Sequence, residues 1–229
     1  MIKVILWDID GTLLDFKEAE RQGMKNCFAK FGLCECSDEM IARYAKINDD
    51  YWELLEKGGI TRQELFTARF KDFFVTEGID FTQYDAFNKE YQAQLAEIVV
   101  FRDNGYELIK ELKGQVKQYA VTNGSFNVQS RKLAKAGLKE LFEDCFISDQ
   151  IGVEKPNVEF FDHVKMVIGE FADDEILIVG DSLTSDIKGG NNAGILCCWY
   201  NPQKKENTKG VRIDYEVQNL QEVKRILNL

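Results

Sequence analysis

Two aspartates follow a short apolar run near the start of the sequence. Asp8 and Asp10 come directly after the run 2–7 and are followed by Gly11 and Thr12. This run predicts a buried strand, on which side chains alternate, so both carboxylates should point to the same side. Two like charges so close repel each other unless a cation or a shared proton relieves them. The pair therefore indicates a metal ion with phosphate chemistry, or alternatively a polar turn that ends a strand.

Polar residues also stand after later apolar runs. These are Thr122 and Asn123 after the run 116–121, Asp181 and Asp186 after the run 176–179, and Lys155 before an amphipathic segment. Ligands of open parallel α/β sheets bind beyond the carboxyl ends of the strands, so we expect these side chains to converge on one crevice. Taken singly, each also fits a helix cap, a solvated lysine or a turn residue.

The order of these groups resembles the haloacid dehalogenase (HAD) superfamily. Its pattern is D-x-D-x-T, a Thr or Ser at a strand end, a Lys, and then G-D followed by a further Asp, which here spans Asp8 to Asp186. Segments 12–16, 151–156 and 180–202 resemble the YjjG-type pyrimidine 5′-nucleotidase branch in particular. The similarity covers most of the expected core and much less of the region between Lys17 and Val99.

The resemblance implies a role for each residue of the pattern. Asp8 would be the nucleophile, which forms an aspartyl-phosphate and also ligates Mg²⁺. Asp10 would be the general acid and base, with its carbonyl on the metal. The remaining roles would be phosphoryl-oxygen binding by Thr122 and the amide of Asn123, charge neutralisation by Lys155, direct Mg²⁺ ligation by Asp181, and support from Asp186 without direct contact with the ion. Hard oxygen ligands suit Mg²⁺ rather than zinc.

Hydrophobic periodicity defines the expected domain organisation. Residues 17–99 show apolar positions at helical spacing in four stretches, and Thr61 to Glu64 forms a capping box. The flanking segments carry the apolar runs of strands. We therefore expect an α/β, Rossmann-like doubly wound parallel sheet formed by residues 1–16 and 100–229. The family resemblance implies that residues 17–99 are an inserted all-helical cap of the C1 type, in which the Phe-rich stretch 66–74 packs.

Composition limits the partners of the chain. It has 229 residues and a net charge of −10, which argues against a nucleic-acid polymer as partner. No apolar run approaches the roughly 20 residues that span a bilayer, and the first run is too short for a signal peptide. The six cysteines form no C-x-x-C motif and do not indicate a zinc site. Because no secretion signal is present, we expect reduced thiols in a cytoplasmic protein without membrane association. We also expect a monomer or weak homodimer.

Three functions remain to be compared. A Mg²⁺-dependent phosphatase on a small-molecule phosphate ester is expected first, and the branch resemblance implies a nucleoside 5′-monophosphatase that prefers pyrimidine (deoxy)nucleotides. Phosphoglycolate or a sugar phosphate is the alternative substrate. A metal-independent haloacid dehalogenase would lack Asp10 and an inactive binding module would lack complete motifs, so both are less favoured. An aromatic side chain could stack on a base, and Phe16, which follows the nucleophile loop, is the candidate, with hinge packing as its other interpretation.

Overall fold

The computed structural model describes residues 1–229, which fall into two compact units. The first comprises Met1–Asp15 and Val100–Leu229, and is called the core unit below. The second, Phe16–Val99, is called the helical unit. The chain leaves the core unit once and returns to it once.

The core unit is built on one six-stranded sheet in which every neighbouring pair is parallel. The strand order is β3-β2-β1-β4-β5-β6. The first five strands are runs of mostly apolar residues, as expected for strands covered on both faces. They confirm the predicted fold class. The bounds are β1 Val4–Trp7, β2 Lys117–Thr122, β3 Asp144–Ile147, β4 Ile176–Gly180, β5 Leu196–Tyr200 and β6 Tyr215–Val217.

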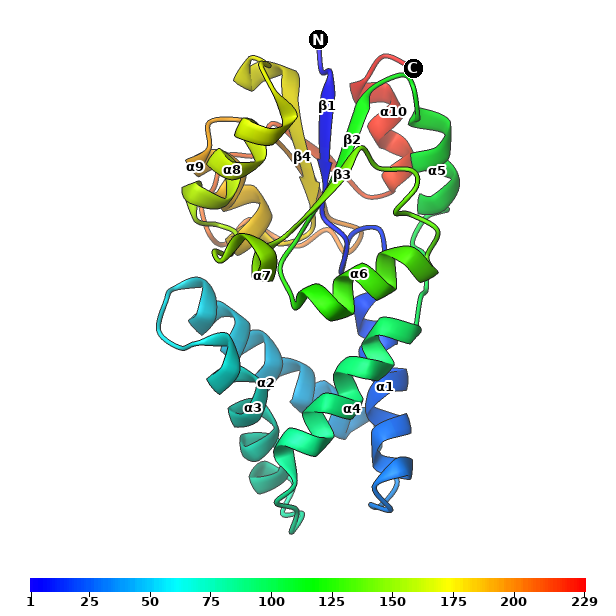
Figure 1. Cartoon of the computed structure of the whole chain (residues 1–229), viewed down its shortest axis with the longest axis vertical. Helices are drawn as coiled ribbons and strands as arrows, with labels where there is room; N and C mark the ends of the chain where they lie inside the picture. Colours follow the sequence, from blue (N-terminus) through cyan, green and yellow to red (C-terminus); the bar gives the residue numbers. More distant parts are fainter. The chain divides into compact units, whose positions relative to one another are not determined.

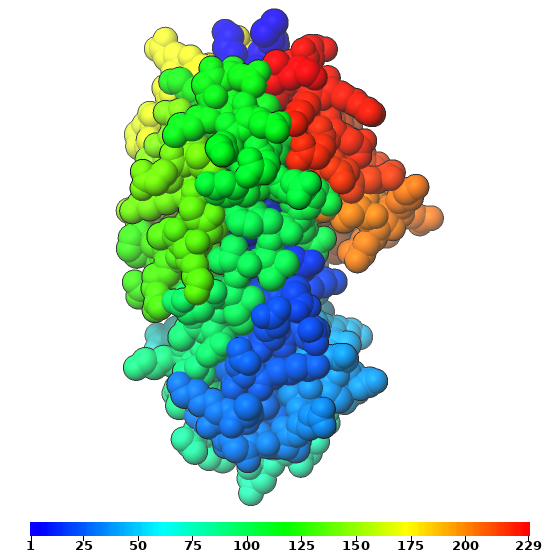
Figure 2. Space-filling view, turned by 90° about the vertical axis from the view of Figure 1, so that its right-hand side faces the viewer, coloured from blue at the N-terminus to red at the C-terminus, as the bar shows by residue number.

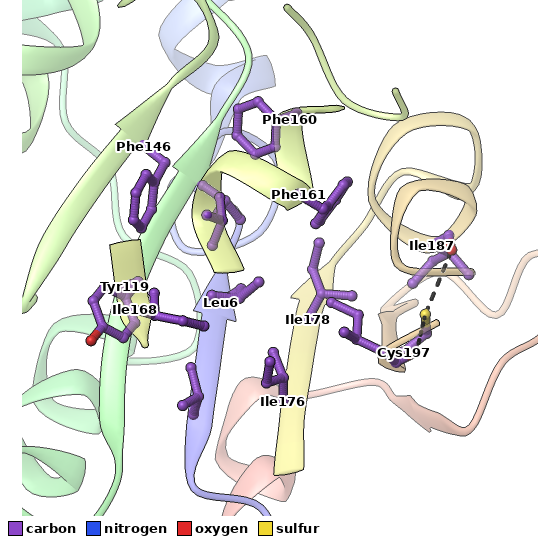
Figure 3. Packing of buried hydrophobic residues seen from close by; sticks show 14 of the residues in the cluster. Leu6, Tyr119, Phe146, Phe160, Phe161, Ile168, Ile176, Ile178, Ile187 and Cys197 are labelled. Carbon is purple, nitrogen blue, oxygen red and sulfur yellow. Dashed lines mark hydrogen bonds between the residues drawn. The ribbon is translucent and has the colours of Figure 1, made fainter. Parts of the chain in front are cut away.

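Helices cover both faces of this sheet (Figure 1). Side chains of β1, β2 and β4 pack on one face against the apolar side of α8 (Figure 3). Phe160 and Phe161 lie there above Ile178, and Cys197 donates its thiol hydrogen to the carbonyl of Ile187. The helices of this unit are α5 Gly105–Leu112, α6 Phe126–Lys135, α7 Ser148–Ile151, α8 Val158–Ile168, η1 Asp173–Glu175, the π-helical turn η2 Leu183–Ile187, α9 Lys188–Asn192, η3 Leu220–Glu222 and α10 Val223–Ile226.

A polar chain fastens the other face of the sheet to α5. The indole Nε1 of Trp7 donates to Gln118 Oε1 at 3.1 Å, and Gln118 Nε2 donates to the carbonyl of Ile109 at 2.9 Å. All three residues are buried, so the amide of Gln118 is satisfied without water. The C-terminal segment lies beside α5 on this face, as Figure 2 shows in red and green.

The helical unit contains four helices whose interior is dominated by aromatic rings. The helices are α1 Phe16–Lys30, α2 Asp38–Glu56, α3 Arg62–Thr76 and α4 Tyr84–Glu97. The Thr61–Glu64 capping box opens α3 as predicted. Phe70, Phe73 and Phe74 are fully buried, and the rings of Tyr44 and Phe70 stack with centroids 5.1 Å apart. These phenylalanines of the Phe-rich stretch therefore form part of the hydrophobic core of this unit.

Where the chain leaves and re-enters the core unit, its two segments pair with each other. Leu14 and Phe101 form an antiparallel bridge, the amide of Asp15 donates to the carbonyl of Val100 at 2.8 Å, and the amide of Arg102 donates to that of Leu13 at 3.0 Å. The guanidinium of Arg102 also lies 3.0 Å from the Asp15 carboxylate. These bonds hold the two crossing points side by side.

Candidate active site

The loop after β1 carries the two aspartates of the first motif. β1 ends at Trp7, so Asp8 and Asp10 lie beyond the strand and the alternation expected of strand residues does not apply. The loop is closed by two backbone bonds, from Gly11 to the carbonyl of Leu14 and from Leu14 to that of Ile9. Its tight turn, rather than strand pleating, sets the direction of each carboxylate.

Lys155 lies at the centre of the site. Its Nζ donates to Asp8 Oδ1 at 2.9 Å, to Asp186 Oδ1 at 2.7 Å and to the carbonyl of Val121 at 2.8 Å. The side chain is 1% exposed, so its charge is tolerable only because these acceptors surround it. Residues from β2 and from the segments that follow β1 and β4 therefore meet at one ammonium group.

Burial and charge shift the pKa values of this cluster in opposite directions. Burial raises the pKa of Asp8 well above its usual value, repulsion from Asp186 adds to this, and the ammonium of Lys155 opposes both. Burial alone would lower the pKa of Lys155, but the two carboxylates outweigh it and raise that pKa. The two carboxylates therefore favour the charged form of Lys155.

Thr122 is the last residue of β2 and Asn123 follows it directly, so both lie at the carboxyl end of this strand as the sequence predicts. Asn123 uses its side chain on Lys155: Nδ2 donates to the Lys155 carbonyl, and Oδ1 accepts from the Lys155 amide, each at 3.0 Å. This reciprocal pair fixes the backbone from which the lysine extends. Thr122 is buried at the end of the strand. Whether Thr122 and the Asn123 amide hold phosphoryl oxygens stays a prediction.

Three carboxylates of the site lie close enough to share a cation. Oxygen atoms of Asp8, Asp181 and Asp186 lie within 4.8 Å of one another. Lys155 contributes one positive charge among these three groups, so ionised carboxylates leave a local excess of two negative charges. A divalent cation with a preference for oxygen would balance that excess, and Mg²⁺ fits the donor set.

The third carboxylate, Asp181, is the one that solvent reaches. Thr12 Oγ1 lies 2.9 Å from Asp8 Oδ2 and 3.3 Å from Asp181 Oδ1, so its single hydrogen can be donated to either acid, and Asp8 is the nearer acceptor. Loss of solvent and, second, repulsion from Asp186 raise the pKa of Asp181. A cation at this position would favour the ionised form.

Glycines make the close approaches in this site possible. Gly11 has φ +99°, and a Cβ there would lie 2.5 Å from Asp181 Oδ1. A Cβ on Gly180 would lie 2.3 Å from the carboxyl carbon of Asp186. Both distances are too short for any side chain, so the backbone at these two positions is part of the site's packing.

Two residues that the sequence analysis missed contact Asp10. Lys132 Nζ lies 2.6 Å from Asp10 Oδ1 and 2.8 Å from Oδ2, and Gln129 Nε2 donates to Oδ2 at 2.8 Å. Both lie on α6. The signal was present, because Gln129 and Lys132 share the helix face of the apolar residues Val128 and Leu133, where a lysine is unusual.

Two further residues lie apart from this cluster. Phe16 is the first residue of α1 and of the helical unit. Its contact with a substrate stays a prediction. His163 lies on α8, with its ring centroid 6.1 Å from that of Phe146, so it packs as a helix-face residue.

Comparison with known proteins identifies the family. Residues 5–200 match the model of the haloacid dehalogenase-like hydrolases. The chain belongs to this family. It is 35% identical to the putative HAD-hydrolase YfnB of Bacillus subtilis over 99% of this chain and 96% of that protein. The crystal structure of YfnB bound to magnesium, which reveals interdomain movement, superimposes with a TM-score of 0.92 and covers 100% of this chain and 99% of that one.

Two further relatives of this hydrolase are named pyrimidine 5′-nucleotidases. PynA of Streptococcus pneumoniae is 34% identical over 96% of this chain and 93% of its own length. YjjG of Escherichia coli is 28% identical over 97% of this chain and 96% of its own length. Both span the helical unit as well as the core unit. Separately, none of the helices is long and apolar enough to cross a membrane.

Proposed function

We propose that this hydrolase is a Mg²⁺-dependent phosphomonoesterase that acts through an aspartyl-phosphate. The observation that carries the proposal is the unequal environment of the two loop aspartates. Asp8 is buried and held by Lys155 and Thr12, whereas Asp10 has a separate pair of partners on α6. Two acids in different environments can take two different roles, one as nucleophile and one as proton carrier.

The first half-reaction breaks the ester. A carboxylate oxygen of Asp8 attacks phosphorus, and the bond to the ester oxygen breaks as that oxygen takes the proton of Asp10. Lys155 and Thr12 hold the Asp8 carboxylate in place for the attack. In the second half-reaction, Asp10 takes a proton from water, whose oxygen attacks phosphorus and releases inorganic phosphate and free Asp8.

Asp8, Asp181 and the carbonyl of Asp10 would hold the ion. Asp186 would support these ligands without contacting the ion. When bound there, Mg²⁺ supplies positive charge that stabilises the phosphoryl oxygens. Thr122 and the Asn123 amide, at the end of β2, would bind these oxygens from the other side. Asn123 thereby links the phosphate site to the backbone of Lys155.

A nucleoside 5′-monophosphate with a pyrimidine base is the proposed substrate. The support is the similarity to PynA and YjjG along nearly the whole chain. Phe16, at the start of the helical unit, is the aromatic residue proposed to stack on the base. Phosphoglycolate or a sugar phosphate is the alternative, since the same chemistry serves any small phosphomonoester.

Kinetics on a substrate panel test these proposals. We expect kcat/KM with Mg²⁺ to be higher for dUMP or dTMP than for AMP, phosphoglycolate and a hexose phosphate. Asp8→Asn should abolish all of these activities, because an amide is a poor nucleophile. If phosphoglycolate or the hexose phosphate exceeded both pyrimidine nucleotides tenfold, the nucleotide proposal would fail and the phosphatase proposal would survive. Metal-independent release of halide from a 2-haloacid, without phosphatase activity, would overturn both.

A further inference from the structure

Two side chains of α6 donate hydrogen bonds to the carboxylate of Asp10. Lys132 contacts both carboxylate oxygens, at 2.6 and 2.8 Å, and Gln129 contacts Oδ2 at 2.8 Å. We call Gln129 and Lys132 the α6 clamp. The three bonds fix the rotation of the carboxylate about its own axis, because they reach both of its oxygens from one helix.

The clamp is built into the interior of the core unit. Lys132 is 1% exposed and Gln129 is 3% exposed. An ammonium group in such a position costs free energy unless an anion and further hydrogen bonds compensate it. A lysine that served only to cover the helix would keep its charged end in water. Lys132 instead directs its Nζ at Asp10, which indicates a role at that carboxylate.

The loop before α6 has a glycine where a side chain would collide with Gln129 of the α6 clamp. Gly124 has φ +148°, and a Cβ there would lie 2.8 Å from Gln129 Nε2 and 3.2 Å from its Cγ. The atom that a side chain would displace is therefore the one that donates to Asp10. Gly124 itself is anchored, since its amide donates to Ser148 Oγ at 3.1 Å.

We propose that Lys132 is a positioning residue for the acid–base step, assisted by Gln129. The proposal rests on the proposed function, in which Asp10 gives a proton to the ester oxygen and later takes one from water. Each transfer requires the carboxyl group to lie within hydrogen-bond reach and in the right orientation. The α6 clamp supplies that orientation, so Lys132 acts through Asp10 and does not touch the substrate.

The proposal is tested by a double-mutant cycle between Lys132→Met and Asp10→Asn. In the wild-type background we expect Lys132→Met to lower kcat for an alkyl phosphate about 10- to 100-fold, less than the whole acid–base contribution of about 10²–10⁴. In the Asp10→Asn background the same change should cost less than about twofold, because no acid is left to position. Lys132→Arg should recover part of the activity, since it restores the charged donor.

Leaving-group dependence and phosphate binding separate positioning from other roles. The first-turnover release of nitrophenol should fall less in Lys132→Met than that of an alkyl alcohol, because nitrophenolate needs little protonation. The inhibition constant of inorganic phosphate should change less than about threefold. Lys135→Met, on the exposed side of the same helix, removes an equal charge and should leave kcat unchanged.

Each contrary result has a distinct meaning. Additive losses in the cycle would overturn the positioning role, and a rise in the phosphate inhibition constant as large as the loss of kcat would assign Lys132 to phosphate binding instead. If Lys132→Met failed to fold, Lys132→Arg and Gln129→Leu would take its place in the same cycle. A wild-type chain without phosphatase activity on any ester would overturn the proposed function itself, and the clamp's role with it.

Discussion

At the residue scale, the site depends on how lysines are distributed among carboxylates. Lys155 forms ion pairs with Asp8 and Asp186, whereas Lys132 forms an ion pair with Asp10. The two loop aspartates therefore do not share a counter-charge, although only one residue separates them.

Removal of Lys155 should destabilise the core unit. Lys155→Met leaves two carboxylates without their ammonium partner, and breaking a buried ion pair in this way typically costs about 3–5 kcal/mol. We expect a loss of that order in the free energy of unfolding, measured by urea titration with a metal chelator present. Mg²⁺ should restore part of the loss, because it brings positive charge to the same carboxylates. Lys139→Met, at an exposed position, is the control; an equal loss there would contradict the argument.

The turn glycine of the first motif should prove necessary for metal binding. Gly11→Ala places a Cβ 2.5 Å from Asp181 Oδ1, so Asp181 must move. We expect the Kd for Mg²⁺, measured by calorimetry, to rise about tenfold or more, which is about 1.4 kcal/mol. Gly114→Ala provides a matched control, because Gly114 has φ +85° with no neighbour within 4 Å of its Cβ. If Gly114→Ala weakened Mg²⁺ binding as much as Gly11→Ala, the loss of affinity would come from backbone strain alone and not from the contact with Asp181.

The motif residues other than Lys155 were predictable from sequence because they follow apolar runs, and parallel strands bring their carboxyl ends together. Lys155 was assigned from the order of the family pattern. The α6 clamp was not predictable from sequence, because the contact between Lys132 and Asp10 spans 122 positions and depends on how α6 packs on the sheet. The pairing of Asn123 with the Lys155 backbone was missed for the same reason. Short motifs specify chemistry, while their supporting contacts are set by tertiary packing.

At the element scale, the helical unit buries a polar network among its aromatic rings. Glu20 of α1 accepts from Tyr91 at 3.2 Å and from Asn48 at 3.3 Å, and Asn48 in turn accepts from Arg69 at 2.7 Å. Arg69 also lies over the rings of Phe70 and Tyr91. The network links helices α1, α2, α3 and α4 and so specifies how they align.

This network should make the stability of the helical unit depend on pH. Burial, and then the charge of Asp49, raises the pKa of Glu20 from 4.5 to about 7. The folded unit therefore binds a proton at Glu20 that the unfolded chain releases between these values, so the contribution of Glu20 to stability is fully present below about pH 4.5 and is lost as pH rises towards 7. A difference of this size corresponds to about 3 kcal/mol.

Glu20→Gln should flatten that dependence, because the amide cannot ionise. The measurement is chemical unfolding followed by far-UV circular dichroism at pH 5 and pH 8, and the wild type should be the less stable at pH 8. Glu35→Gln, at an exposed position in the same unit, should retain the wild-type slope. A Glu20→Gln variant with an unchanged slope would show that another group carries the proton.

Elements with strong periodicity were predictable, and the short edge strand β6 was not. The runs of β1, β2, β4 and β5 are apolar throughout most of their length, and the helices of residues 17–99 show clear spacing. β6 has three residues, of which Tyr215 and Glu216 are exposed, so it has no buried pattern to detect. α5 was missed although its buried residues fall at helical spacing.

At the scale of the whole molecule, two units share a chain that crosses between them twice. The crossings fall at 15/16 and 99/100. We expect the helical unit to open for substrate and to close for catalysis, since exclusion of water protects an aspartyl-phosphate. The segments expected to flex are 15–17 and 99–103.

Limited proteolysis tests this motion. Beryllium fluoride with Mg²⁺ mimics a phosphorylated aspartate, and we expect it to slow cleavage within 15–17 and 99–103 severalfold. Asp8→Asn should abolish the protection, because the mimic needs the carboxylate. Unchanged cleavage of the wild type, with beryllium fluoride binding verified by fluorine NMR, would indicate that the two units do not change their arrangement.

The paired crossing segments have a consequence for how such a protein diversifies. Because Leu14 and Phe101 lie across one antiparallel bridge, the inserted unit is joined to the core unit like a hairpin loop closed by a short stem. The entropy of closing a loop grows only slowly with its length, so the stem tolerates inserts of very different size and sequence. Recombination at this stem would replace the helical unit while the proposed nucleophile Asp8, Lys155 and the proposed cation ligands stayed as they are.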